Sequence, residues 1–422
     1  MAAVQDKKTV IDGDYSLEAV PSSARKGFIS MFFIMLGFTF FSASMWTGVS
    51  LAQGLDMNGF IGAVVIGGAI LAAYTGVLGY IGCETGLSFD LLAHKSFGSK
   101  GSYLPSAMIS FTQIGWFGVG AAMFAIPAAS ELNRMMGTDY EWLCYVLVAI
   151  VGVCMTGSAY FGIKALEIVS YISVPLIAIL GTWSMTMAIR DGGGFVAMFN
   201  QSSGSLSLFT GVGLVIGSFV SGGTATPNFV RFAKDNKTAV ITTVIAFFLG
   251  NTLMFVFGGT AGAFANGAND IFYVMIAQGL AIPAFIVLGA NIWTTNDNAL
   301  YTGALGLSNI TKVRKRPMVI VSGIIGTVAA VWLYNNFSGW LSVLNCTLPP
   351  IGAIIALDFF LNRDKYREGV KDEYDINWAS IIGVICGAVV GNLVTWGIAS
   401  INAMVVGCAC YLIGRAVSRK GK

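Results

Sequence analysis

Long apolar runs separated by short polar breaks constrain this chain more than any other feature of its sequence. Roughly 20 apolar residues in a helix cross the hydrocarbon core of a bilayer, and the runs recur at about that length. We expect helices near 28–51, 58–82, 103–130, 142–161, 165–189, 207–232, 238–264, 280–306, 317–334, 338–361, 377–394 and 397–414. Only 11% of the residues are charged, against roughly 25% in an average soluble domain. The sequence therefore predicts an all-α integral membrane protein with twelve transmembrane helices in a lipid bilayer.

The basic residues predict on which side of the membrane each loop lies. Cytoplasmic loops of membrane proteins are enriched in Lys and Arg. With a cytoplasmic N-terminus, 22 of the 24 Lys and Arg residues fall in cytoplasmic segments, and only Arg134 and Arg190 fall outside. We expect a multi-pass protein of the cytoplasmic (inner) membrane with both termini in the cytoplasm. The stretches 86–101 and 270–278 are predicted to be helices within loops that do not cross the membrane.

Two of the expected helices are interrupted near the middle of the membrane. LGFTFFSASMW at 36–46 and IGSFVSGGTATPNF at 216–229 both place Gly and hydroxyl residues at that depth. Glycine costs roughly 1 kcal/mol in a helix, and unwound backbone survives in hydrocarbon only where it is buried in protein or lines a cavity. Close helix packing by small residues is the alternative for either segment alone. The matching positions of Gly37 and Gly217 in the two halves favour a substrate site.

The same match divides the chain into repeats. We expect a cytoplasmic segment at 1–27, a first five-helix repeat at 28–190, a second, inverted five-helix repeat at 206–361, two accessory helices at 377–416 and a cytoplasmic tail at 417–422. The inversion follows because an odd number of crossings in the first unit reverses the orientation of the second.

The third expected helix carries an amide beside an indole. In TQIGWFGVG, at 112–120, Gln113 and Trp116 lie three residues apart and share one helical face. A buried amide needs a hydrogen-bond partner, and together the two groups suit a planar heterocycle. The alternative is hydrogen bonding between helices by Gln113 and ordinary packing by Trp116.

The eighth expected helix is unusually polar. In ANIWTTNDNALY, at 290–301, Thr294 and Thr295 offer the oxygen ligands that a small alkali cation such as sodium prefers. Back-bonding of these hydroxyls to their own helix is the alternative. Asp297 could bind the cation or could pair with a basic residue of another helix.

Signatures of several other functions are missing from the sequence. There is no P-loop, no zinc-binding His-Glu helix and no basic run interleaved with aromatic residues. We therefore expect neither an enzyme nor a nucleic-acid partner, and no cofactor. Uphill transport would have to draw on an ion gradient. The sequence leaves the oligomeric state open.

These residues make the sequence similar to the nucleobase:cation symporter-1 family. The resemblance extends over about residues 20–415. It rests on VPSSARKG (20–27), LGFTFFSASMW, SFGSKGS (96–102), QIGWFGVGAAMFAIP, NIWTTNDNALY and LYNNFSGW. It implies a leucine-transporter-like fold with a 5+5 inverted repeat. It also implies import of a nucleobase, most specifically cytosine, by sodium symport and alternating access. The alternative is a proton-coupled permease for another nucleobase or a hydantoin- or allantoin-like heterocycle, with Asp297 or Glu167 carrying the proton.

The resemblance also implies a binding site for the base and for the cation. The ring would be held by Trp116 and Phe219 and bordered by Phe41. Hydrogen bonds to it would come from Gln113, Ser218, Ser221 and Asn296. Sodium would bind the backbone carbonyls of Gly37, Phe40 and Asn291 and the hydroxyls of Thr294 and Thr295. A hydantoin-type site in this family places a second tryptophan on the sixth span, whereas the break here offers only Phe219, so the resemblance favours a small pyrimidine over a bulkier ligand.

Overall fold

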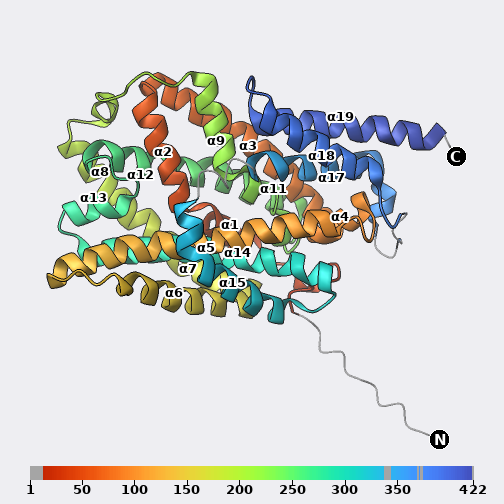
Figure 1. Ribbon diagram of the computed structural model, residues 1–422, viewed down its shortest axis with the longest axis horizontal. Coiled ribbons are helices and arrows are strands. Elements are labelled where there is room, and N and C mark those ends of the chain that lie inside the picture. The colour runs from red at the N-terminus through yellow and green to blue at the C-terminus, as the bar shows by residue number, and fades with distance from the viewer. Residues whose placement is uncertain (1–12, 337–343, 368–369, 371–373, 421–422) are drawn as a thin grey trace, which may run out of the picture.

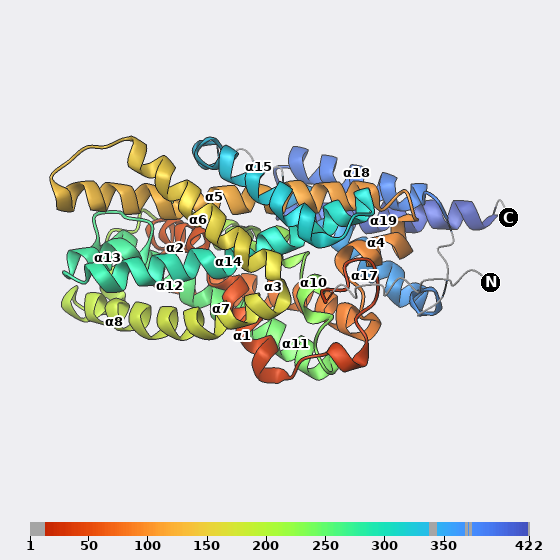
Figure 2. The ribbon, with the colours of Figure 1, turned by 90° about the horizontal axis from the view of Figure 1, so that it is seen from below.

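The computed structural model describes residues 13–336, 344–367, 370 and 374–420, and the side chains among them as far as residue 417. Over these ranges the chain is helical, with one isolated bridge between Lys26 and Ala233 and no strand. The two predicted loop helices are present as α4 (Phe89–Phe97) and α13 (Ile271–Ala277). Both views place α4 and the C-terminal end of α19 at one end of the long axis and α13 at the other (Figures 1 and 2).

Eight helices in the described ranges are long and apolar enough to cross a membrane, or nine if the bent pair α1–α2 forms one span. They are α3 (Met57–Thr85), α5 (Tyr103–Met136), α6 (Trp142–Phe161), the continuous helix Ile163–Asp191 made of α7, η2 and α8, the continuous helix Asn236–Phe264 made of α11, η4 and α12, α15 (Lys315–Asn335), Leu344–Leu361 with α17 (Pro349–Leu361), and α19 (Ala399–Lys420). The protein is therefore an all-α, multi-pass membrane protein.

Three further helices match predicted spans without meeting that test of length and composition. They are α9 (Leu208–Gly223), α14 (Ala281–Thr311) and α18 (Trp378–Leu393). α9 and α18 are short, whereas α14 is 31 residues long and rich in polar residues. The full count of twelve and the two repeats stay predictions. The start of the predicted span 338–361, the end of the LYNNFSGW stretch, residues 1–12 and residues 421–422 lie outside the described ranges.

Both predicted helix interruptions are present. α1 (Phe28–Thr39) and α2 (Ser42–Gly54) meet at a 58° bend, with extended backbone at Phe40 and Phe41. The second break separates α9 from the short α10 (Pro227–Val230). There the Thr224 and Thr226 hydroxyls donate to the carbonyls of Val220 and Gly223. The backbone amides of Thr224 and Thr226 donate to the same two carbonyls, so each hydroxyl adds a second hydrogen bond there.

Glycines let α2 and α12 (Asn251–Phe264) cross with their backbones in contact. A Cβ added to Gly258 would lie 1.8 Å from the carbonyl oxygen of Met45, and one added to Gly48 would lie 2.1 Å from that of Phe255. No larger residue fits at either position without moving a helix. Close approach through small residues is typical of packing between membrane helices.

A buried charge cluster, here called the N-terminal latch, joins the first described residues to two distant helices. It consists of Asp14, Tyr15, Arg231 and Lys315. The Lys315 ammonium lies 2.6 Å from the Asp14 carboxylate, and the Arg231 guanidinium donates to the carbonyls of Asp14 (2.8 Å) and Tyr15 (2.9 Å). Arg231 and Lys315 are fully buried. The latch therefore holds the segment around Asp14 against the end of α10 and the start of α15.

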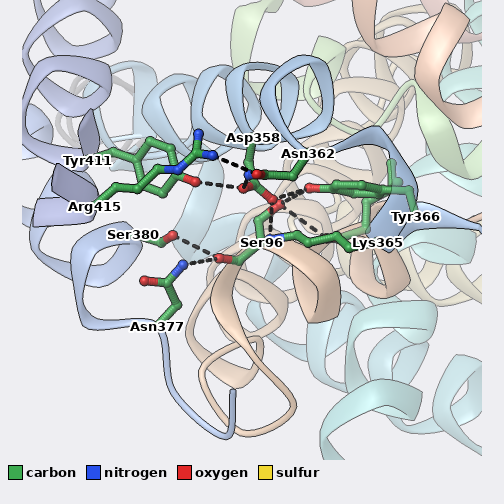
Figure 3. Close-up of polar contacts among 10 residues, drawn as sticks. Ser96, Asp358, Asn362, Lys365, Tyr366, Asn377, Ser380, Tyr411 and Arg415 are labelled. Atoms are coloured by element: carbon green, nitrogen blue, oxygen red, sulfur yellow. Dashed lines mark hydrogen bonds and ion pairs between the residues drawn. The ribbon is translucent and has the colours of Figure 1, made fainter. Parts of the chain in front are cut away.

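A second buried acid ties the accessory helices α18 and α19 to the rest of the molecule (Figure 3). Asp358 of α17 is fully buried and accepts hydrogen bonds from Tyr411 of α19 (2.6 Å) and from Tyr366 (2.5 Å). Ser380 of α18 donates to the Ser96 carbonyl of α4 at 2.8 Å. Helices α17, α18, α19 and α4 are thereby held as one group.

Candidate functional site

A cavity lies between the two helix breaks. It is lined by Phe38, Phe41, Gln113, Trp116, Ser218, Phe219, Ser221, Gly222, Thr295 and Ala299. These residues come from the α1–α2 break, α5, α9 and α14. Of the seven residues predicted to contact the base, the structure brings all except Asn296 into this one cavity. Phe38, Gly222 and Ala299 are lining residues that the sequence reasoning missed.

The aromatic walls of the cavity are held by edge-to-face contacts. The Trp116 and Phe41 rings have centroids 5.5 Å apart and planes at 73°, and the Phe219 and Phe38 rings are 5.2 Å apart at 83°. Such pairs are preferred over face-to-face sandwiches because of the ring quadrupoles. The two contacts fix the orientation of Trp116 from one side and of Phe219 from the other. A planar ligand would enter a site whose aromatic surfaces are already positioned.

Gln113 supplies an unused hydrogen-bond donor at the cavity wall. Its side chain is only 2% exposed, and its Nε2 atom has no hydrogen-bond partner among the described residues. Ser218 donates to the Val215 carbonyl at 2.8 Å and accepts from Asn251 Nδ2 at 3.2 Å. A buried amide left unpaired costs about 1–3 kcal/mol. A ligand carrying a hydrogen-bond acceptor would remove that cost.

Asn296 lies on a different side of α14 from the cavity. Its Nδ2 donates to the Phe117 carbonyl of α5 at 2.9 Å. Gly120 makes room for this contact, since a Cβ there would lie 2.0 Å from Asn296 Oδ1. Consecutive helical residues point about 100° apart, so Asn296 faces α5 while Thr295 faces the cavity. In this structure Asn296 joins two helices.

The Thr295 hydroxyl lies among backbone carbonyls at the first helix break. Its Oγ1 is 2.9 Å from the Phe40 oxygen, 3.4 Å from those of Gly37 and Phe38 and 3.5 Å from that of Asn291. One hydroxyl hydrogen serves one of these acceptors well. The bend in the chain also removes the usual i+4 amide partners of carbonyls at the end of α1. The arrangement is a group of oxygen atoms suited to a cation.

Thr294 follows the alternative expected from the sequence. Its Oγ1 donates to the Ala290 and Asn291 carbonyls of its own helix at 3.1 and 3.2 Å. Its lone pairs remain available for a cation, because back-bonding uses only the hydroxyl hydrogen. The structure therefore brings Thr295 and the carbonyls of Gly37, Phe40 and Asn291 together, with Thr294 beside them.

Ser170 is a neighbouring hydroxyl that the sequence reasoning missed. It is fully buried on α7 (Ile163–Leu176), and its Oγ has no hydrogen-bond partner in the described part of the chain. A Cβ added to Gly37 would lie 2.5 Å from this oxygen and 3.3 Å from Thr294 Cβ. The glycine therefore lets α1 approach α7 and α14 closely. Ser170 therefore adds an oxygen without a hydrogen-bond partner beside the backbone carbonyls of the α1–α2 break.

The two acids considered as proton carriers differ in their surroundings. Asp297 is fully buried, and neither of its carboxylate oxygens has a hydrogen-bond or ion-pair partner among the described residues. Pairing with a basic residue, one of the two roles expected from the sequence, is therefore not seen. Glu167 forms an ion pair with Lys26 and accepts a hydrogen bond from Ser30.

Residues 19–414 match the family described as permeases for cytosine/purines, uracil, thiamine and allantoin. The cytosine permease of Escherichia coli (strain K12) is 48% identical over 404 residues, which cover 95% of this chain and 94% of the relative.

Solved structures of other transporters share the fold. The nucleobase-cation-symport-1 family transporter Mhp1, in a closed conformation with bromovinylhydantoin bound, gives a TM-score of 0.78 at 16% identity over 96% of this chain and 95% of that chain. A Na+-coupled sialic acid symporter gives 0.70 at 16% identity over 96% and 93%.

Proposed function

The chain belongs to the family of permeases for cytosine/purines, uracil, thiamine and allantoin, and on this premise we propose that it imports cytosine by sodium symport and alternating access. Membership confirms the resemblance inferred from the sequence and makes the protein a nucleobase-family transporter rather than an enzyme. The high identity to a cytosine permease supports cytosine over the other substrates of the family.

The unpaired Gln113 amide facing an aromatic cavity is the observation that carries the base-binding proposal. Cytosine is planar, and its ring carbonyl and ring nitrogen accept hydrogen bonds. Its faces would stack against Trp116 and Phe219 while Gln113 Nε2 donates to one of these acceptors. Ser218 and Ser221 line the same cavity and would bind the remaining polar edge.

The oxygen atoms around Thr295 support sodium as the coupling ion. We propose that the Gly37, Phe40 and Asn291 carbonyls bind it together with the Thr294 and Thr295 hydroxyls. The Thr295 hydroxyl already lies within 3.5 Å of all three carbonyl oxygens. Backbone carbonyls of unwound helix segments are known to coordinate sodium in transporters.

Base and cation would be coupled through α14 and the α1–α2 break. Thr295 lines the base cavity and also contacts the break carbonyls. A sodium ion that draws the break onto α14 would therefore also fix Phe38 and Phe41 at the cavity wall. Such coupling is a reciprocal free energy, so each ligand would tighten the binding of the other.

The proposed transport cycle requires a site that opens to each side in turn. We propose that the N-terminal latch closes the α4 side of the base cavity, which lies between the two breaks. We propose twelve crossings, with α9, α14 and α18 completing the nine apolar spans, in the inner membrane with both termini in the cytoplasm. Opening the latch would then release base and sodium to the cytoplasm.

Uptake of radiolabelled cytosine into proteoliposomes tests the proposal. We expect an inward sodium gradient to stimulate uptake several-fold over an equal choline gradient, and unlabelled cytosine to compete better than uracil, hypoxanthine, allantoin or hydantoin. Equal uptake in sodium and choline would remove the sodium claim. Uptake driven by a proton gradient without sodium would favour the proton-coupled alternative.

A further inference from the structure

A second cavity is lined by residues at the start of α2, on α5, around α13 and at the end of α15. We call it the outer cavity and define its polar lining as Ser42, Trp46, Asn269, Asp270, Tyr273 and Tyr334. Met123 of α5 also lines it, two helical turns, or about 10 Å, beyond Trp116. In the predicted topology the outer cavity therefore lies on the external entrance path.

Asp270 brings a negative charge to this cavity without a basic partner. Its side chain is 5% exposed, and within the described ranges no Lys, Arg or His nitrogen lies within 4 Å of its carboxylate. Burial raises the pKa of Asp270, and hydrogen bonds from Ser42 and the Phe272 amide oppose the rise. Burial and the Asp270 charge raise the pKa of Tyr273 to about 12.

Ser42 connects the outer cavity directly to the proposed sodium site. Its hydroxyl donates to Asn291 Oδ1 at 3.0 Å and also faces the Asp270 carboxylate. Because the Ser42 hydroxyl donates its hydrogen to Asn291, the lone pairs of its oxygen stay available for a cation. The Asn291 carbonyl is itself one of the proposed sodium ligands. The outer cavity and the sodium site are therefore separated by a single hydrogen-bonded side chain.

The charge balance of the predicted external loops also favours a cation as the ligand of the outer cavity. These loops carry six acidic residues against Arg134 and Arg190. Both arginines are already paired with acids, Glu131 and Asp191. A cleft with acidic walls and few basic groups attracts cations and raises their local concentration. A neutral base would leave the Asp270 charge uncompensated, whereas a cation would neutralise it.

We propose that the outer cavity is a second binding site for a monovalent cation, with the Asp270 carboxylate as its charged ligand, from which sodium passes to the inner site. The oxygens of Ser42 and Asn269 and the hydroxyls of Tyr273 and Tyr334 would complete the ligand set beside water. This inference rests on the proposed sodium coupling. The site would raise the rate and apparent affinity of sodium loading without contacting the base.

Asp270→Asn tests the outer site with little change in shape. Asn caps a helix about as well as Asp, so the bond from the Phe272 amide to the Asp270 side chain, 2.9 Å in the wild type, should persist. In sodium titrations of cytosine uptake we expect the half-saturating sodium concentration to rise roughly tenfold, with the cytosine KM at saturating sodium unchanged. The matched control is Asp191→Asn, which removes an exposed acid from the same predicted face and should leave both constants unchanged.

Cation binding is also measured by thermal stability, without transport. A failure of the outer cation site can then be distinguished from a failure of sodium-coupled transport. In a Thr295→Ala background, which weakens the inner site, sodium at constant ionic strength should still raise the thermal stability, and adding Asp270→Asn should abolish that residual shift. An unchanged residual shift overturns the outer site, whatever the uptake assay shows. Absence of sodium-stimulated uptake in the wild type overturns only the proposed coupling. A higher cytosine KM with an unchanged sodium constant in Asp270→Asn would make the cavity a base site and overturn the inference.

Discussion

At the scale of single residues, the proposed recognition of the base divides between a flat surface and a hydrogen-bond donor that lie one helical turn apart on α5. Trp116 provides the surface and Gln113 the unpaired Nε2. Both were predicted from the sequence because an amide and an indole on one face of an apolar helix form a local pattern. Phe38 and Gly222 were missed because they reach the cavity only through the packing of α1 against α9.

Trp116→Ala should weaken cytosine binding by about 1–3 kcal/mol, the usual value of one aromatic stack on a base. This corresponds to a roughly 5- to 150-fold higher Kd, measured by equilibrium binding to the purified protein in sodium. Trp183→Ala is the matched control, since Trp183 is 49% exposed on α8 (Thr182–Asp191) and should leave the Kd unchanged. An unchanged cytosine Kd in a folded Trp116→Ala protein would show that the Trp116 indole only packs against its neighbours and does not bind the base.

Ser170→Ala should raise the half-saturating sodium concentration, because the unpaired Oγ of Ser170 lies beside Gly37 and Thr294. Thr295→Ala should have the same effect more strongly, and both should alter the base affinity little once sodium is saturating. Sodium titration of the thermal stability gives the constants. Ser322→Ala removes another unpaired, buried serine oxygen, on α15, and should have no effect. A larger effect of Ser170→Ala on base affinity than on sodium would contradict the assignment.

Helix breaks were predictable at the scale of elements, whereas the departures from α-helical geometry inside two spans were not. The breaks were predicted from Gly37, Gly217 and the hydroxyl residues near them, although Gly217 itself lies inside α9 and the second break follows Gly223. The π-helical segments η2 (Ile177–Gly181) and η4 (Ala246–Gly250) are apolar and carry no comparable signal. A Cβ at Gly250 would lie 2.7 Å from Thr39 Oγ1, so η4 lies directly against the first break.

Gly48→Ala should disrupt the crossing of α2 and α12, since its methyl group would lie 2.1 Å from the Phe255 carbonyl oxygen. We expect a destabilisation of about 1–3 kcal/mol or more from overpacking, seen as a lower melting temperature in detergent and reduced uptake. Gly157→Ala on α6 meets nothing within 4 Å and should be neutral or slightly stabilising, because alanine favours a helix. Equal melting temperatures for the two variants would show that α2 and α12 separate at no cost.

At the scale of the whole molecule, the sequence predicted an α-helical, multi-pass protein, but not the contacts that join residues far apart in the chain. Hydropathy is read along the chain, so the spans follow from local composition. The latch joins Asp14 to Arg231 and Lys315, and no pattern along the chain pairs residues so far apart. The same holds for Asp358 and Tyr411, which fasten the accessory helices.

Asp14→Ala should open the latch, because it leaves the fully buried Lys315 ammonium without its carboxylate. Breaking a buried ion pair costs about 3–5 kcal/mol. We expect faster tryptic cleavage after Arg25 or Lys26 in the purified protein. Asp364→Ala, which breaks an ion pair with Arg367 whose side chains are 86% and 77% exposed, should leave the cleavage rate unchanged. Identical rates for Asp14→Ala and wild type would mean that the latch does not hold the segment.

The latch also has a consequence for biosynthesis. Arg231 lies 217 residues after Asp14, so at roughly 5–20 residues per second the ribosome needs about 10–40 s to supply the partner. During that interval several helices enter the membrane while the segment around Asp14 waits for its partners. The latch therefore forms late in the synthesis of each chain. A nascent protein cut short before Arg231 would leave the segment without its partners, and quality-control proteases could then distinguish unfinished from finished copies.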